Sequence, residues 1–90
     1  MIINLTDKAK EKILEYNKNN VPVKVKITGY SWCGARFGVV SEKQEHNDKS
    51  YNVEGVDVIV SEELEGAMKG MKINYSTNWL NKGFEVLPEF

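Results

Sequence analysis

The first regular pattern of apolar residues lies near the N-terminus. Apolar side chains recur there at spacings of four, four and three residues, at Leu5, Ala9, Ile13 and Tyr16. This spacing predicts a helix with one apolar face. Thr6 or Asp7 can cap the helix, because a side-chain oxygen at that position accepts a hydrogen bond from an otherwise unpaired amide. The short apolar run "MIIN" precedes the helix, and the polar run 17–20 ends it.

The pattern changes to strict alternation from Val21 to Thr28. Valine and isoleucine alternate with lysine and threonine, which predicts a strand with one solvated face. Pro22 lacks an amide donor, so we expect it at the start of the strand or on an edge. The stretch "GYSWCGARFG" at 29–38 is expected to be a turn or loop, and "FGVV" at 37–40 predicts the returning strand.

The second half of the chain alternates polar runs with short strand patterns. The polar run 41–50 is expected to be a mobile loop. Two alternating runs flank Glu54-Gly55, which predicts a hairpin. Ser61 can cap a short helix that Gly70 can end. Further alternation predicts two last strands joined by a loop, in the order 71–75, 76–83 and 84–90.

The predicted elements favour an α+β fold. No run is typical of a long helix between parallel strands, so we expect an antiparallel or mixed sheet covered by the N-terminal helix. The chain has 90 residues, no internal repeat and no linker. This length suits one domain, and residues 1–90 are therefore predicted to form a single domain.

The charge balance argues against several classes of function. Twelve Lys and Arg residues against thirteen Asp and Glu residues leave a formal net charge of -1. This balance gives no long-range attraction to nucleic acid or to an anionic membrane. The N-terminus has neither the apolar core of a secretory signal nor a span of about 20 apolar residues. We expect a cytoplasmic protein that binds neither nucleic acid nor membrane.

The distinctive chemistry of the sequence lies in residues 29–38. They include Cys33, which is the only cysteine, together with one of the two tryptophans and Arg36. One thiol and one histidine fall short of the four ligands of a structural zinc site. A catalytic thiol usually needs a nearby base, and the only histidine, His46, lies in the polar run 41–50. The larger aromatic residues are expected to be core or loop-anchoring residues: Trp32, Phe37, Trp79 and Phe84.

Three stretches, taken in order, resemble the HesB/IscA-like family, the A-type iron-sulfur assembly proteins. "INLTDKAKEKI" is similar to the "LT-x-x-A" opening of that family. "VEGVDVIVSEELEGAMKGMKINY" and "NKGFEV" are similar to its later strand–helix–strand stretch and its closing "GF" motif. The series spans nearly the whole chain. The resemblance implies a HesB-like domain, rich in β-strands in mixed or antiparallel sheets, with an N-terminal helix and a short second helix.

The stretch "GYSWCGARFGVV" is similar to the cluster-binding loop of the HesB-like branch, approximately "G-[FY]-x-C-[SC]-G-P-x-[FL]-G-L". Matching the glycine and aromatic positions places Trp32 where the family has its loop cysteine, and Cys33 one position later. A shifted alignment puts Cys33 on the ligand position but loses the glycine and aromatic matches. The resemblance implies four cofactor-binding candidates, with Cys33 also the candidate metal ligand: Trp32, Cys33, Gly34 and Arg36.

The resemblance also implies a function. Family members that carry clusters add a C-terminal cysteine pair, which "GFEVLPEF" lacks. A [2Fe-2S] cluster held only by protein thiolates needs four cysteines, and a homodimer of this chain has two. The implied protein is non-enzymatic and handles iron or an iron-sulfur cluster with an incomplete ligand set. Its implied partners are iron-sulfur assembly proteins, and it is a monomer or homodimer.

Two other hypotheses remain open at this point. One is a relative that has lost cluster binding and recognises a protein or small ligand through residues 29–38. The other is a thiol-dependent enzyme or redox sensor, in which Arg36 favours the Cys33 thiolate by its charge.

Overall fold

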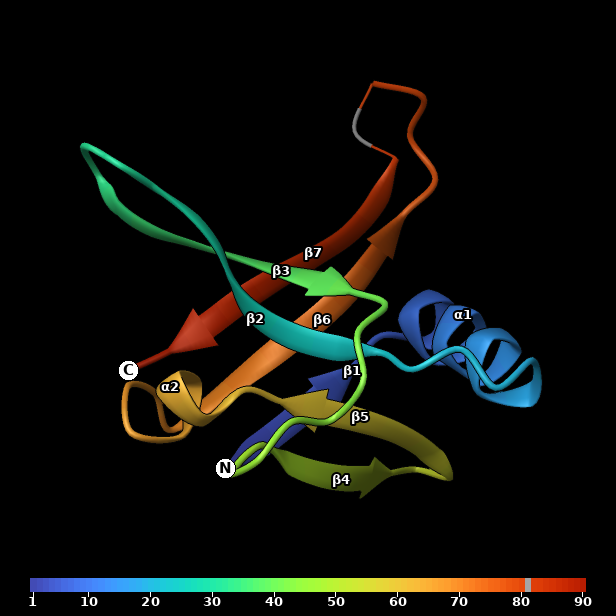
Figure 1. Cartoon of the computed structure of the whole chain (residues 1–90). Coiled ribbons are helices and arrows are strands. Elements are labelled where there is room, and N and C mark those ends of the chain that lie inside the picture. Colours follow the sequence, from blue (N-terminus) through green and yellow to red (C-terminus); the bar gives the residue numbers. More distant parts are fainter. Residues whose placement is uncertain (81) are drawn as a thin grey trace.

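The computed structural model describes residues 1–80 and 82–90. Its elements are β1 (Ile2–Leu5), α1 (Asp7–Lys18), β2 (Lys24–Ser31), β3 (Gly34–Val40), β4 (Lys49–Val53), β5 (Val56–Val60), α2 (Glu62–Glu65), β6 (Gly70–Ser76) and β7 (Gly83–Glu89) (Figure 1). The strands of the described residues form two mixed sheets, ordered β1-β6-β7 and β3-β2-β5-β4. Each sheet contains one parallel pair, β1–β6 or β2–β5. The predicted α+β class is confirmed.

Helix α1 begins where its capping residue predicts. Thr6 Oγ1 accepts a hydrogen bond from the Ala9 N–H at 3.3 Å. The same hydroxyl donates to Asn74 Oδ1 on β6 at 2.9 Å, so the cap also attaches the helix to a sheet. The helix packs against β5 and β6 with Ala9 and Ile13 completely buried. The predicted apolar face is therefore correct for Ala9, Ile13 and Tyr16, whereas Leu5 precedes the helix and belongs to β1.

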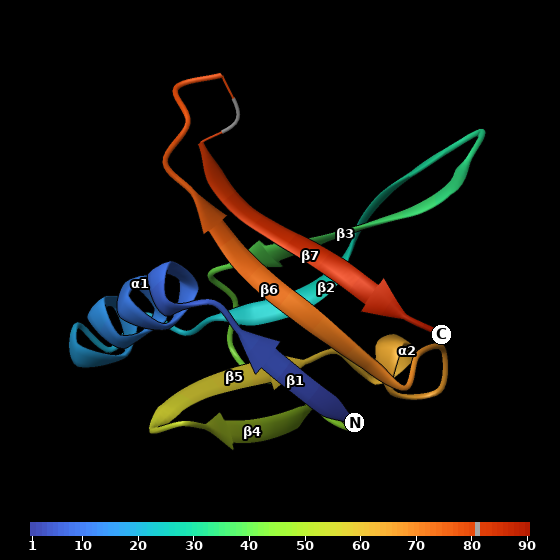
Figure 2. The ribbon, with the colours of Figure 1, turned by 180° about the vertical axis from the view of Figure 1, so that it is seen from behind.

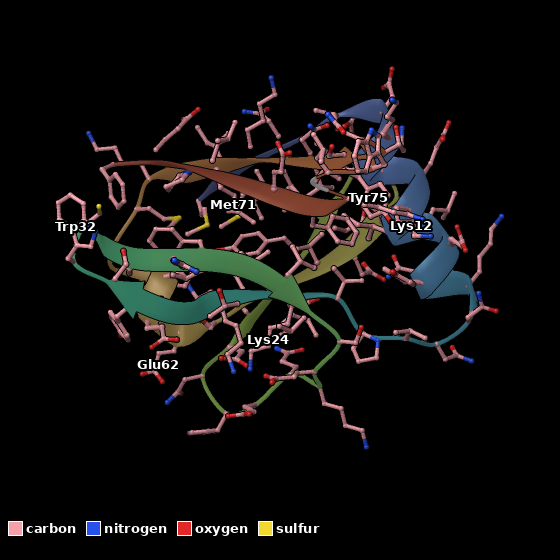
Figure 3. All side chains as sticks on the ribbon, turned by 90° about the horizontal axis from the view of Figure 1, so that it is seen from above. Lys12, Lys24, Trp32, Glu62, Met71 and Tyr75 are labelled. Carbon is pink, nitrogen blue, oxygen red and sulfur yellow. The ribbon has the colours of Figure 1, made fainter. Side chains whose placement is uncertain are left out.

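The hydrophobic core lies between the two sheets. Alternation along β5 buries Val56, Val58 and Val60 in the core and leaves Asp57 exposed. Met71 and Ile73 of β6 enter the core from the other sheet, and Figure 3 shows Met71 in the space between the two sheets. Leu64 of α2 is completely buried in the same cluster. Burial of each such side chain favours folding by about 1.5–3 kcal/mol.

Strand β1 was not predicted. It lies along β6 in parallel, with Ile2 opposite Gly70 and Leu5 opposite Ile73, as the view from behind shows (Figure 2). A run of four residues has too little periodicity to identify a strand. Its partner is also far away along the chain, so no local signal connects the two.

The predicted end of the second helix at Gly70 is wrong. Helix α2 ends at its C-cap, Gly66, and Gly70 is the first residue of β6. A Cβ atom at Gly70 would lie 2.5 Å from the carbonyl oxygen of Ile2. Glycine is required here because β1 passes so close to the backbone, and not because a helix terminates.

The predicted hairpin at Glu54-Gly55 is confirmed. Both residues have positive φ, 51° and 89°, as a two-residue type I′ turn requires. Val53 and Val56 close the hairpin on either side of the turn. The last two strands are also present, and the predicted loop between them includes Asn81, which lies outside the described residues.

Strand β2 differs from its prediction at its start and on its outer face. It begins at Lys24, after Pro22, and continues to Ser31. The Lys24 side chain was expected to be solvated, but it is only 4% exposed. Its Nζ lies 2.7 Å from Asp48 Oδ2, and the Asp48 side chain is 6% exposed. Residues 41–50 were predicted to be a mobile loop, but the last two begin β4 and the segment 41–48 is attached to the outer face of β2 by a buried ion pair.

Asp48 also organises the start of α2. Its Oδ2 accepts a hydrogen bond from the Glu45 N–H at 2.9 Å, and its Oδ1 accepts one from the Glu62 N–H at 3.1 Å. Ser61 occupies the predicted N-cap position but makes no side-chain cap hydrogen bond. A carboxylate from another segment thus accepts the first amide of α2, and the capping bond expected from the Ser61 hydroxyl is absent.

The two partners change each other's pKa. The hydrogen bond from Lys24 lowers the pKa of Asp48 below its ordinary value of 3.8. The hydrogen bond to Asp48 raises the pKa of Lys24 above 10.5, although burial acts in the opposite direction. The stabilisation from Asp48 is present above pH 3.8 and is lost as the pH falls through its lower folded-state pKa. The stabilisation from Lys24 is present below pH 10.5 and is lost as the pH rises through its raised pKa.

Replacing Asp48 should destabilise the fold strongly. We expect Asp48→Asn to lower the free energy of unfolding by about 3 kcal/mol at pH 7, because the Lys24 ammonium stays buried without its closest counter-ion. Urea denaturation measures this change. The control Lys26→Met removes a partly exposed ion pair with Glu42 and should change stability by less than about 1 kcal/mol. The difference between wild type and Asp48→Asn should shrink below pH 3.8. Equal stability of the two at pH 7 would contradict the assignment.

Candidate functional site

The candidate site lies on a β-hairpin, and the turn or loop expected over residues 29–38 is limited to Trp32 and Cys33. Strands β2 and β3 remain paired to the end, with Tyr30 opposite Ala35 and Ser31 opposite Gly34. Only Trp32 and Cys33 form the turn. Figure 1 shows this hairpin projecting from the body of the protein. Clustered glycines suggested a loop, but they are compatible with a hairpin where the strands twist strongly or turn.

A β-bulge at the base of the hairpin explains one of these glycines. The register shifts between Ile27 and Gly29, which leaves Thr28 without a partner on β3. A bulge of this kind increases the local twist of the strands. A Cβ atom on Gly38 would lie 2.8 Å from Thr28 Cγ2. Gly38 therefore leaves space for the bulged threonine.

The turn is held by contacts with Ser31. Its Oγ accepts a hydrogen bond from the Cys33 N–H at 3.3 Å and donates one to the Gly34 carbonyl oxygen at 3.4 Å. Gly34 has a φ of 120°, a conformation that side-chain-bearing residues rarely adopt. A glycine after Cys33 is thus a requirement of the turn itself.

The two tryptophans were expected to be core or loop-anchoring residues, but neither is buried. The Trp32 side chain is 97% exposed, and that of Trp79 is 85% exposed. Figure 3 shows Trp32 at the tip of the hairpin, pointing away from the core. Phe37 and Phe84, in contrast, are partly buried and pack against the core, as predicted. The hairpin tip therefore presents an aromatic ring beside the exposed Cys33 thiol.

Three of the four predicted site residues follow one another at the hairpin tip, where Trp32 and Cys33 form the turn and Gly34 begins β3. The fourth, Arg36, follows on β3 opposite Gly29. His46 lies outside the hairpin, in the segment that covers β2. Within residues 1–80 and 82–90, no three His, Cys, Asp or Glu side chains are grouped so that they can hold a metal ion.

An apolar groove of about 830 Å³ lies between the hairpin and β7. Cys33, Gly34 and Arg36 line it from the hairpin. Apolar side chains supply much of the remaining wall: Ile27, Phe37, Val86, Pro88 and Phe90. Sequence reasoning missed the contribution of β7 because it lies far from the hairpin along the chain. The alternation of apolar residues from 84 to 90 could have indicated one buried face, but not its partner.

The family model described as iron-sulphur cluster biosynthesis matches residues 1–86. The chain belongs to this family. The resemblance to HesB/IscA-like proteins, drawn from the ordered motifs, is therefore confirmed. A comparison with curated protein sequences gives no significant match.

Several solved structures share the fold of this chain. The Escherichia coli SufA crystal structure, described as involved in biosynthesis of iron-sulfur clusters, has a TM-score of 0.68 and 21% identity, covering 94% of this chain and 78% of SufA. A crystal structure of IscA with the [2Fe-2S] cluster has a TM-score of 0.71 and 11% identity, with coverages of 97% and 82%. A solution NMR structure from Aquifex aeolicus has a TM-score of 0.67 and 21% identity, with coverages of 96% and 90%. At these identities the likeness shows the fold.

The described helices include none with the length and apolar character needed to cross a bilayer.

The exposure of both tryptophans predicts a simple fluorescence result. We expect the emission maximum of the folded protein to match that of the protein in denaturant, because both indole rings are already in contact with water. Iodide should quench the emission of Trp32→Phe and Trp79→Phe variants to a similar extent. A folded-state emission shifted to shorter wavelength, lost in Trp32→Phe, would show that the hairpin tip is covered.

Proposed function

We propose that this protein acts in iron-sulfur cluster biosynthesis as a non-enzymatic, cytoplasmic protein that offers a single thiolate, Cys33, to iron or to a cluster. The observation that carries the proposal is the position of that thiol. Cys33 is exposed on a two-residue turn at the end of a projecting hairpin. Membership of the iron-sulphur cluster biosynthesis family supports this role.

The residues of this chain do not by themselves fit a bound cluster. A [2Fe-2S] cluster held only by thiolates needs four cysteines, and the chain has one. The described residues contain no group of three His, Cys, Asp or Glu side chains suited to a metal. Iron or a cluster is therefore cargo that needs ligands from outside the chain. A low-molecular-weight thiol or a partner protein can supply them.

The surroundings of Cys33 suit contact with an assembly protein. Tyr30 is 78% exposed on the same hairpin, and Trp32 adjoins the thiol. Aromatic residues of this kind are enriched at the centres of protein interfaces. A partner that covers the hairpin tip would bury these rings and would bring its own ligands next to Cys33.

Anaerobic reconstitution tests this proposal. The wild-type protein is incubated with iron and sulfide, with and without glutathione, and then desalted for iron counting and absorption spectroscopy. We expect iron and a visible chromophore to be retained when glutathione is present, because the thiol completes the ligand set. Cys33→Ala should lose both, whereas His46→Ala should retain them, since His46 lies outside the hairpin. Absence of iron from the wild type under both conditions, or equal retention by Cys33→Ala, would overturn the proposal.

The apolar groove favours a second candidate function. In this alternative the protein no longer binds a cluster and recognises a small apolar ligand, or an apolar side chain of a partner, through residues 29–38. A volume of about 830 Å³ lies within the usual range for ligand sites, which are mostly apolar with a few polar groups. Arg36 is the one charged residue among those that line the groove in the described part of the chain.

Binding of 1-anilinonaphthalene-8-sulfonate to the iron-free protein separates the two functions. The aromatic body of this fluorescent probe suits the groove, and its sulfonate suits Arg36. If the groove is a ligand site, we expect saturable binding that Ala35→Glu weakens at least tenfold, because a carboxylate then enters the apolar space. Ala35→Ser is the matched control and should bind like wild type. Absent or unsaturable binding, or equal binding by Ala35→Glu, would count against this alternative and leave the reconstitution result unaffected.

A further inference from the structure

A polar pocket of about 540 Å³ lies on the outer face of the four-stranded sheet. It is lined by Lys24 and Lys26 of β2, by Glu45 of the segment 41–48 that covers β2, and by Ser61, Glu62 and Glu63 at the start of α2. In Figure 3, Lys24 and Glu62 both lie on the side of this sheet that faces away from Met71 and the second sheet. The pocket shares no lining residue with the groove beside Cys33.

The pocket has surplus negative charge. Its two lysines are already paired, because Lys24 Nζ lies 2.7 Å from Asp48 Oδ2 and Lys26 Nζ lies 3.1 Å from Glu42 Oε2. Among the described residues, Glu62 and Glu63 form no salt bridge. Glu45 has only a distant contact, with its Oε1 3.8 Å from the already paired Lys24 Nζ. The unmatched carboxylates of the wall therefore favour a cationic occupant and disfavour an anionic one.

Ser61 is the second, independent indication of a ligand. The residue is only 6% exposed, and its Oγ is buried without a hydrogen-bond partner among the described residues. Buried polar side-chain atoms normally have a partner. The usual partner for a serine at this position is the second or third backbone amide of the helix, but Ser61 makes no such bond, and the Leu64 N–H is donated to the Ser61 carbonyl oxygen instead. Ser61 also lines the pocket, so its unpartnered hydroxyl borders the space that an occupant would fill.

We propose that this pocket binds a primary alkylammonium group. Such a group carries three N–H donors around one charge, which matches the Ser61 hydroxyl and the carboxylates of Glu62 and Glu63. A metal ion fits less well, because the described residues hold no group of three ligating side chains. The ammonium comes either from a free polyamine or from a lysine side chain of a protein partner, and the two sources share this chemistry.

Isothermal titration of the metal-free protein with cadaverine, spermidine and Nα-acetyl-lysine amide tests the proposal. We expect saturable binding of at least one of these amines, with no binding of 1-pentanol, which has no charge. Binding of the lysine derivative would indicate a protein source, and binding of the free amines alone would indicate a polyamine. Affinity should fall as salt is added, because the attraction is between partly exposed charges.

Variants locate the binding. The double variant Glu62→Gln/Glu63→Gln should weaken amine binding at least tenfold, and Glu85→Gln on β7 is the matched control that should bind like wild type. Ser61→Ala should weaken binding several-fold without lowering stability, since it removes an unpartnered hydroxyl. Equal loss in the Glu85→Gln control, absence of saturable binding, or displacement of the amine by equimolar Mg²⁺ would overturn the proposal. None of these measurements depends on Cys33 or on iron, so they fail or succeed separately from the proposed function.

Discussion

The buried ion pair between Lys24 and Asp48 joins three segments, of which residues 41–48 have no helix or strand of their own. It attaches the polar segment 41–48 to β2, and the same carboxylate accepts the first free amide of α2. Lys24, the first residue of β2, thereby becomes a buried residue. The arrangement also shapes the polar pocket on the outer face of the four-stranded sheet, since the segment 41–48 and the start of α2 both line that pocket. Packing of the valine-rich inner face acts independently of this contact and holds the two sheets together.

The sequence predicts the parts of the fold whose signals are local. The cap at Thr6, the apolar spacing of α1 and the Glu54-Gly55 turn each depend on residues within a few positions of one another. The failures in the arrangement of the strands involve distant segments. Strand β1 depends on β6, and the burial of Lys24 depends on Asp48. Alternation identifies which residues share a face of a strand, but it does not say which segment covers that face.

In the candidate site, too, local features were predicted and contacts between distant segments were missed. Its rare residue types identify residues 29–38 as the chemically distinctive part of the chain, and the ordered motifs identify the family. The chain reversal between two strands was predicted, but their pairing up to Ser31 and Gly34 was not, because clustered glycines are equally typical of an irregular loop. The groove was missed as well, since Phe90 and its neighbours on β7 meet the hairpin only after folding.

The two-residue turn gives its two side chains different surroundings. Trp32 extends into solvent, whereas the adjacent Cys33 also borders the groove toward β7. In the alignment that matches the glycine and aromatic positions, the family's cysteine falls on position 32, which here points into solvent. The thiol of this chain stands at position 33, which lines the groove. A shift of the cysteine by one residue therefore changes which surface lies next to the thiol. A group that reaches the exposed Cys33 thiol from solvent therefore also meets the apolar wall of the groove.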